Sequence, residues 1–209
     1  MKLELERVAP MEIEARSFEI IESELPHPLD PATAPIVKRV IHATADFDYA
    51  DNLFISDGAV DAALQALREG AVIVTDTTMA MAGINKRALA RLGGEARCFI
   101  ADPDVAEEAA RLGVTRSQVS MDRAAAIDRP LILAIGNAPT ALVRACELMD
   151  EGRLRPRLVI GAPVGFVNVE ASKELLMRTD VPRVVARGRK GGSNVAAAIC
   201  NALIYMLGR

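Results

Sequence analysis

The sequence has few residues of the kinds that build disulfides and metal sites. It contains 2 histidines and 3 cysteines among 209 residues. Cys98, Cys146 and Cys200 are odd in number and widely separated, with no C-x-x-C spacing, which argues against a disulfide framework or a structural zinc site. The histidines form no H-E-x-x-H or two-histidine, one-carboxylate pattern. We therefore expect no metal and no cofactor, and three buried thiols that pack as small apolar groups.

Long apolar runs and a strong excess of one charge are also missing. No apolar stretch approaches the ~20 residues of a membrane-spanning helix, and the start, MKLELERVAP, lacks the apolar core of a signal peptide. The net charge of -3 provides no general basic field, so nucleic acid and anionic membranes are disfavoured as partners. These absences predict a cytoplasmic protein. The 51% of hydrophobic residues can bury a core, and the length fits a single domain over 1–209.

Short apolar runs alternate with longer helical segments along the chain. Between the runs, Ala-, Leu-, Arg- and Glu-rich segments carry apolar residues at helical spacing. This alternation predicts an α/β fold with three α/β/α layers and a mainly parallel central sheet. Two helices, over 11–25 and 36–47, form an N-terminal helical extension. The predicted strands are AVIVT (71–75), RCFI (97–100), LILAI (131–135), RLVIG (157–161) and RVVA (183–186).

Small and polar residues follow the predicted strands. In a parallel sheet, ligands bind beyond the carboxyl ends of the strands, and backbone N–H groups at helix starts favour anions there. An acidic ligand would suit such an edge, although glycine and proline also serve only to turn the chain. The candidate segments are TDTTMA (75–80), GNAPT (136–140), GAPVGF (161–166) and RGRKGGSN (187–194).

Familiar catalytic and phosphate-binding signatures are absent. The sequence contains neither G-x-G-x-x-G after its first predicted strand nor G-x-x-x-x-G-K-[ST]. It also lacks a G-x-S-x-G elbow and any motif that marks an activated cysteine. Arg187, Arg189 and Lys190, together with Arg116, supply cations that could pair with several carboxylates. The competing interpretation is a solvated basic loop.

His42, in the segment IHATADFDYADN, is the one plausible proton donor or acceptor, because imidazole titrates near neutral pH. The competing interpretation is a partly buried histidine that is hydrogen-bonded to Thr44 or Asp46. The other histidine, His27 in LPHPLD, fits a surface turn.

Seven segments, in this order, resemble the precorrin-8X methylmutase family of corrin biosynthesis. They are ARSFEII, VIHATADF, TDTTMAMAG, GVTRSQ, AIGNAPTAL, GAPVGFVNVEASKELL and RGRKGGSNVAAA, and the match runs from about Ser17 to the C-terminal helix. The resemblance implies an isomerase that moves a methyl group from C-11 to C-12 of precorrin-8X, giving hydrogenobyrinate, or of cobalt-precorrin-8, giving cobyrinate. It implies a proton-assisted 1,5-sigmatropic shift without a redox partner.

By this resemblance His42 is the catalytic residue, which protonates or hydrogen-bonds a nitrogen of ring C. A shift of this kind needs a held geometry and a proton, which proximity and general acid catalysis can provide. Met79, Met81 and Phe166 are candidates for an apolar floor under the macrocycle. The substrate-binding residues that the matching motifs imply are Ser17, Arg39, Thr77, Thr78, Met79, Arg116, Ser117, Lys190, Gly191 and Gly192.

The resemblance also implies partners. These are a tetrapyrrole polycarboxylate substrate, a second copy in a homodimer, and the next pathway enzyme as receiver of the product. Two rival functions are a non-catalytic corrinoid carrier and a nucleotide-binding α/β enzyme. No residue separates the metal-free from the cobalt-containing substrate, and Asp46, Asp48 and Asp51 have no assigned role.

Overall fold

The computed structural model describes residues 7–208. The segment MKLELE, on which the expected cytoplasmic location partly rests, lies outside the described residues. Within them, six strands form one sheet in the order β1-β6-β5-β4-β2-β3, and β1 is antiparallel to β6 while the other pairs are parallel. The strands are β1 (Leu53–Ile55), β2 (Val72–Thr75), β3 (Glu95–Arg97), β4 (Leu131–Ile135), β5 (Leu158–Gly161) and β6 (Arg183–Ala186).

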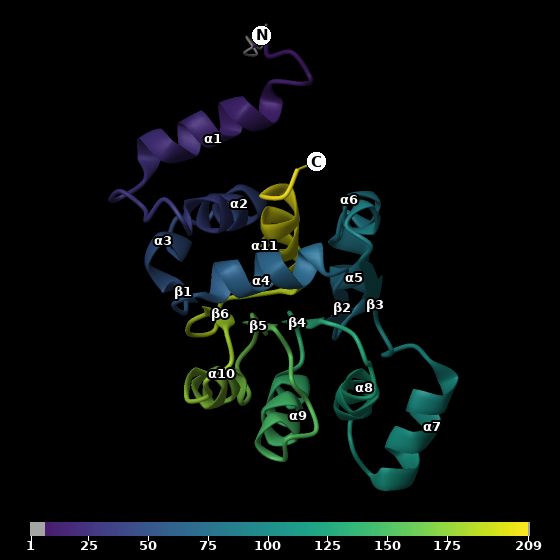
Figure 1. Cartoon of the computed structure of the whole chain (residues 1–209). Helices are drawn as coiled ribbons and strands as arrows, with labels where there is room; N and C mark the ends of the chain where they lie inside the picture. Colours follow the sequence, from purple (N-terminus) through teal and green to yellow (C-terminus); the bar gives the residue numbers. More distant parts are fainter. Residues whose placement is uncertain (1–6, 209) are drawn as a thin grey trace, which may run out of the picture.

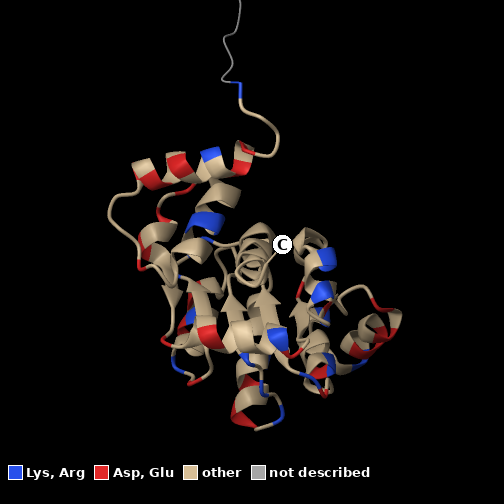
Figure 2. Cartoon of the chain, turned by 45° about the horizontal axis from the view of Figure 1, so that its top comes forward, with Lys and Arg blue, Asp and Glu red and all other residues tan. Residues whose placement is uncertain are grey.

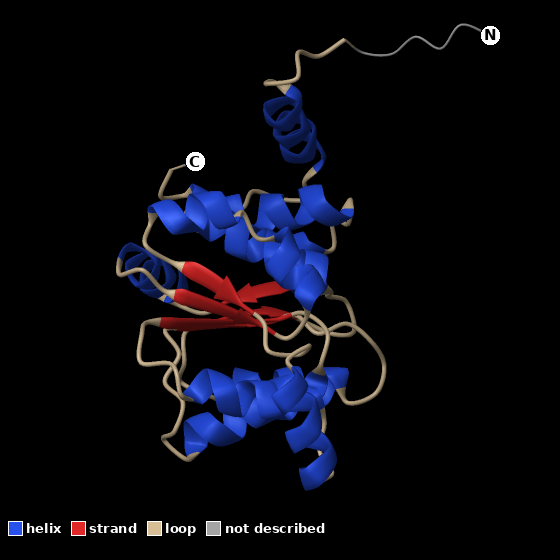
Figure 3. Cartoon of the chain, turned by 90° about the vertical axis from the view of Figure 1, so that its right-hand side faces the viewer, coloured by secondary structure: helices blue, strands red, loops and turns tan. Residues whose placement is uncertain are grey.

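Helices cover both faces of the sheet and make three layers (Figures 1 and 3). One layer contains α1 (Ile13–Glu24), α2 (Ala34–Thr44), α4 (Ala59–Arg68), α5 (Thr78–Gly83), α6 (Lys86–Arg91) and α11 (Ser193–Tyr205). The other layer contains α7 (Pro103–Leu112), α8 (Arg116–Ala125), α9 (Pro139–Asp150) and α10 (Val169–Met177). The short α3 (Tyr49–Asn52) connects α2 to β1. Figure 3 shows α1 outermost in its layer, with other helices between it and the sheet.

The central strands are the best buried part of the molecule. Every residue of β2, β4 and β5 is buried, which matches their near-continuous apolar sequences, because helices pack on both sides. One apolar core joins the sheet to α2, α4 and α11, and a second joins it to α8 and α9. The predicted α/β class, three layers and mainly parallel sheet are confirmed.

Two details of the strand prediction are wrong. Only the first residue of RCFI lies in a strand, because β3 begins two residues before the predicted start and ends at Arg97. β3 lies at the sheet edge and carries Glu95 and Arg97, so its pattern is not that of a buried strand. The strand β1 was not predicted, because three residues between helices give too little pattern. The segment TDTTMA consequently follows the second strand rather than the first.

The helical extension is confirmed with shifted boundaries. The second helix was predicted over 36–47 but ends at Thr44, because Ala45 adopts a left-handed conformation with φ 53° and its N–H bonds to Ile41 O. Pro35 stands in the first turn of this helix, where its missing N–H costs no hydrogen bond. No helix of the described residues is long and apolar enough to span a membrane.

The cysteines are free, but only two are buried. Burial raises the pKa of the Cys146 thiol to about 11 and that of Cys200 to about 12, which leaves both as unreactive core residues. The prediction of a buried Cys98 is wrong. Cys98 is half-buried because it follows the edge strand β3, where the sheet is covered less completely.

Arg129 holds together the edge of the sheet where the parallel strands begin. Its guanidinium donates to the carbonyls of Gly70 and Gly93 and forms an ion pair with Glu95 at 2.6 Å. Gly70 precedes β2, Gly93 precedes β3, and Arg129 itself precedes β4. One side chain therefore ties three chain segments at this edge.

We expect Arg129→Met to lower the free energy of unfolding by about 1–2 kcal/mol, because two backbone carbonyls lose their donor. Urea denaturation followed by circular dichroism measures the change. Arg153→Met is the matched control, since the partners of Arg153 among residues 7–208 are carboxylate side chains and its own side chain is 55% exposed. Its effect should be smaller. Equal effects of the two substitutions would contradict the assignment.

Candidate active site

The segments that follow the parallel strands meet at the carboxyl edge of the sheet. The N–H of Gly192 donates to Ala162 O at 2.8 Å, which joins the segment after β6 to the segment after β5. A Cβ on Gly136 would lie 2.8 Å from Gly192 O, so the turn after β4 also touches this loop. The structure thus brings together three of the four segments that the sequence predicted, and contacts of Asp76 and Thr77 add the fourth. We call residues 187–192 the RKGG loop.

Asp76 fixes the relation between two of these segments. It follows β2 directly and is 1% exposed. Its carboxylate accepts the backbone N–H groups of Gly136 and Asn137 at 2.8 Å and of Ala138 at 2.6 Å. Burial raises the pKa of the Asp76 carboxyl, while the three N–H groups act in the opposite direction. The sequence analysis missed this residue, although an acid directly after a fully buried strand was a usable signal.

The residues after Asp76 form the start of α5. Thr77 Oγ1 accepts the N–H of Ala80 and lies 2.7 Å from Ser193 Oγ at the start of α11. Thr77 therefore links two helix starts at the edge. Thr78 is exposed and Met79 is 70% exposed. Of the three predicted apolar candidates, Met79 and Phe166 are accessible at this edge, and Phe166, which follows β5, is 81% exposed. The third, Met81, is half-buried.

The RKGG loop needs glycine to approach the β5 segment closely. Gly191 has φ 159°, and a Cβ there would lie 2.2 Å from Ala162 O. Gly192 has φ 134°, a region that other residues rarely adopt. Gly191 and Gly192, which the family resemblance predicts to bind substrate, therefore shape the loop.

Lys190 projects from the RKGG loop to the turn that follows α2. Its Nζ lies 2.7 Å from an Asp46 carboxylate oxygen and 2.8 Å from one of Asp48. These two carboxylates raise the pKa of Lys190, and its hydrogen bond lowers the pKa of Asp48. Lys190 is exposed, as the interpretation of a solvated basic loop expects, but it is paired with two acids. Asp46 and Asp48, which had no assigned role in the sequence, are therefore ion-pair partners of Lys190.

His42 occupies the last turn of α2, just before that turn. It is exposed, and its ring centroid lies 5.4 Å from that of Phe18. Thr44 Oγ1 instead donates to Val40 O at 2.8 Å, and no described residue forms a hydrogen bond with the imidazole ring of His42. The interpretation of a partly buried His42 satisfied by Thr44 or Asp46 is therefore wrong. Its ring nitrogens are open to a ligand.

Ser17 and Arg39 lie beside His42 in the helical layer. Ser17 Oγ donates to Ile13 O within α1 at 2.8 Å. The Arg39 guanidinium pairs with Glu14 and lies 4.7 Å from the Phe18 ring centroid. The contacts of Arg39 thus hold α1 against the helix of His42, whereas the hydrogen bond of Ser17 lies within α1.

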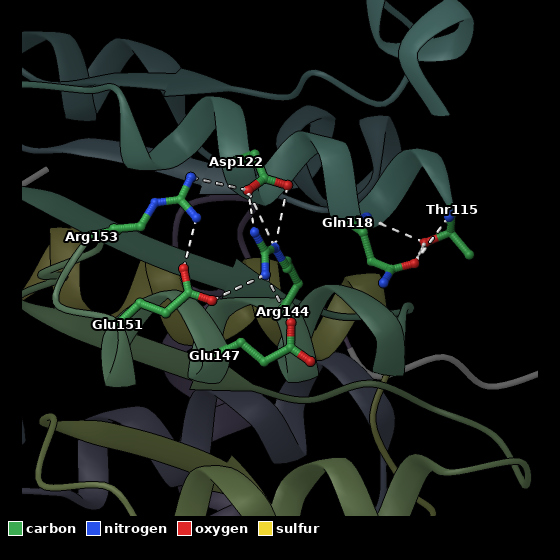
Figure 4. A network of polar contacts seen from close by, with 7 residues as sticks. All are labelled: Thr115, Gln118, Asp122, Arg144, Glu147, Glu151 and Arg153. Carbon is green, nitrogen blue, oxygen red and sulfur yellow. Dashed lines mark hydrogen bonds and ion pairs between the residues drawn. The ribbon is translucent and has the colours of Figure 1, made fainter. Parts of the chain in front are cut away.

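Arg116 and Ser117 begin α8, next to the turn after β4. Thr115 caps this helix, and its Oγ1 donates to Thr140 Oγ1 at 3.1 Å. Figure 4 shows a polar network that joins α8 to α9 farther along, where Arg144 lies 2.7 Å from Asp122. Arg116 is exposed and has no ion-pair partner in the part of the chain described. It therefore presents an open cation near the carboxyl edge.

Charge of both signs is distributed over the molecule. Figure 2 shows acids along α1 with a base among them, and acids and bases on several other helices, whereas α5 and α11 carry no charged side chain. Among residues 7–208, no group of three or more His, Cys, Asp or Glu side chains is placed to hold a metal ion. The chemistry that the edge offers is therefore that of cations, backbone N–H groups, exposed apolar side chains and one open imidazole.

Comparisons with known proteins agree on one family. A family model described as precorrin-8X methylmutase matches residues 12–206. The cobalt-precorrin-8 methylmutase of Salmonella typhimurium is 48% identical over 205 residues, covering 95% of this chain and 96% of that protein. The precorrin-8X methylmutase of Pseudomonas aeruginosa is 41% identical over 167 residues, covering 79% and 80%. The precorrin-8x methyl mutase of Thermus thermophilus has a similar crystal structure, with TM-score 0.85, 41% identity and coverage of 93% and 96%.

We expect Asp76→Asn to lower the free energy of unfolding by about 2–4 kcal/mol, because an amide NH₂ would face buried N–H donors. Chemical denaturation monitored by circular dichroism tests this. The same exchange at the exposed Asp57 serves as the control and should change stability by less than about 0.5 kcal/mol. An Asp76→Asn protein as stable as the control would refute the role of the carboxylate.

Stability should also depend on pH through Lys173 of α10. Burial lowers the pKa of this lysine from 10.5 to about 8. Between these values the unfolded chain holds a proton that the folded chain has released, so raising the pH stabilises the fold. Wild type should therefore gain about 1–3 kcal/mol over Lys173→Met between pH 7 and pH 10. Denaturation curves at several pH values measure the gap, and a constant gap would contradict the shift.

Proposed function

The chain belongs to the precorrin-8X methylmutase family, and on that premise we propose that it is an isomerase of cobalamin biosynthesis. The reaction moves a methyl group from C-11 to C-12 of precorrin-8X or of cobalt-precorrin-8. The observation that carries the proposal is the family match over residues 12–206. Relatives of both names are similar to the chain, so the proposal covers both forms of the substrate.

His42 is the proposed proton donor. In a 1,5-shift the bond from the methyl carbon to C-11 breaks as the bond to C-12 forms, so the reaction needs no nucleophile. A proton or hydrogen bond at the nitrogen of ring C changes the conjugated system that accepts the methyl group. The exposure of His42 and its lack of a described hydrogen-bond partner support this role, because a ligand can reach both ring nitrogens.

The carboxyl edge is the proposed binding surface for the polycarboxylate. Arg116 and Lys190 suit the acetate and propionate groups, with Ser117, Gly191 and Gly192 beside them. Thr77, Thr78 and Met79 are proposed to contact the macrocycle, and the exposed Phe166 extends that apolar surface. Ser17 and Arg39 complete the proposed set from the helical layer, where the contacts of Arg39 support the helix that carries His42.

The proposal extends to the organisation and location of the protein. We propose one domain over 1–209, a homodimer, transfer of the product to the next pathway enzyme and a location in the cytoplasm. Both helical layers pack on the same sheet, which supports the single domain. The exposed Phe166 and Val167, at 81% and 78%, support an associating surface near the site.

A thermal-shift screen separates the proposed enzyme from a nucleotide-binding protein of similar class. Hydrogenobyrinic acid should raise the melting temperature, and nucleotides should leave it unchanged. Stabilisation by nucleotides alone would overturn the proposal. A corrinoid carrier would also be stabilised by hydrogenobyrinic acid, so the carrier is excluded only by turnover of precorrin-8X or cobalt-precorrin-8.

We expect His42→Ala to keep corrinoid binding and to lose rearrangement by at least about 100-fold, the usual contribution of a positioned acid. The visible spectrum of enzymatically made precorrin-8X, incubated with each protein, measures the rate. His27→Ala is the matched control, because His27 is exposed in a turn and contacts Asp51 at 2.9 Å; it should act as wild type. An unimpaired His42→Ala would remove His42 from the mechanism.

A further inference from the structure

We infer that Lys173 is a positioning residue for substrate binding, which sets the RKGG loop so that Lys190 faces the carboxylates of the substrate. The inference rests on the proposed function and deepens it. Lys173 lies in α10, whereas Asp46 and Asp48 follow α2, a helix on the other face of the sheet (Figure 1). Lys173 is not among the residues that the family resemblance implies.

Lys173 is a buried cation whose partners are backbone carbonyls. It is 2% exposed, and its Nζ donates to Gly188 O and to Lys190 O at 2.7 Å each. No described carboxylate forms an ion pair with it. A buried ammonium group is costly unless its donors are satisfied. The two loop carbonyls accept hydrogen bonds from the ammonium group, so the loop and the lysine hold each other in place.

The carbonyls of three consecutive loop residues are held by the β5–α10 side of the molecule. Those of Gly188 and Lys190 accept from Lys173, and Arg189 O between them accepts the N–H of Gly165 at 3.2 Å. With its carbonyl directed at Lys173, the Lys190 residue can extend its side chain to the other side, where its Nζ meets Asp46 and Asp48. Lys173 thereby determines the position of the Lys190 ammonium group.

The loop has a composition that requires such a restraint. It contains three glycines with positive φ, Gly188, Gly191 and Gly192, and glycine loses more conformational freedom on ordering than any other residue. Without the two bonds from Lys173, the carbonyls of Gly188 and Lys190 would turn to water and the loop would sample other conformations. The ammonium of Lys190 would then spend less time at the position where a substrate carboxylate binds.

Calorimetric titration with hydrogenobyrinic acid tests the inference in the full-length protein. We expect Lys173→Met to bind at least tenfold more weakly than wild type. Lys190→Ala should also bind more weakly, and adding Lys173→Met to it should cost less than about twofold, because Lys173 acts through Lys190. A purely structural role would not make the two effects overlap in this way.

Arg129→Met is the matched control for lost stability. It removes a cation that holds two backbone carbonyls, but at the opposite edge of the sheet, and its affinity should equal that of wild type. Affinities are expressed per folded protein, from circular dichroism. If Lys173→Met does not fold, Lys173→Gln retains one donor group and most of the volume, and its affinity should still fall.

Two results would overturn the inference. One is wild-type affinity in a folded Lys173→Met or Lys173→Gln protein. The other is a double variant in which the effects of Lys173→Met and Lys190→Ala multiply in full. A wild-type protein that does not bind hydrogenobyrinic acid would instead count against the proposed function, so the two failures are distinguishable.

Discussion

The carboxylate of Asp76, which accepts three consecutive backbone N–H groups, is the contact on which the carboxyl edge depends. It joins the end of β2 to the turn between β4 and α9. Gly136, the first of its donors, touches Gly192, which in turn donates to Ala162. A single buried acid therefore begins a series of contacts that places the segments after β2, β4, β5 and β6 relative to one another.

Asp76 and Lys173 are buried charges of opposite sign, and backbone groups stabilise both of them. Each is almost completely buried, and within residues 7–208 the hydrogen-bond partners of each are backbone groups and not a counter-ion. A backbone N–H or carbonyl has a fixed direction, so a buried charge that binds several of them dictates the conformation of that segment. Loops of small residues, which have few side chains of their own to pack, are held at this edge by charges from neighbouring elements.

The sequence predicted the buried part of the fold well and its long-range polar contacts poorly. The strands β2, β4, β5 and β6 were found because burial on both faces leaves a continuous apolar run. The edge strands β1 and β3 have three residues each, and β3 carries Glu95 and Arg97, so neither shows a long continuous apolar run. Asp76 and Lys173 were missed because their partners lie 60 and 15 residues away, and no local pattern encodes these contacts. His42 was found because histidine is rare, while its exposure became clear only from the packing of α1 and α2.

The two cations that are proposed to bind substrate carboxylates differ in the ion pairs that they form within the protein. Arg116 is open among the described residues, whereas Lys190 already holds Asp46 and Asp48. A substrate carboxylate that binds Lys190 must share or replace those two acids. Asp46 lies four residues after His42, in the turn that ends its helix. In the proposed enzyme, a carboxylate that binds Lys190 therefore binds beside the turn that ends the helix of His42, the proposed proton donor.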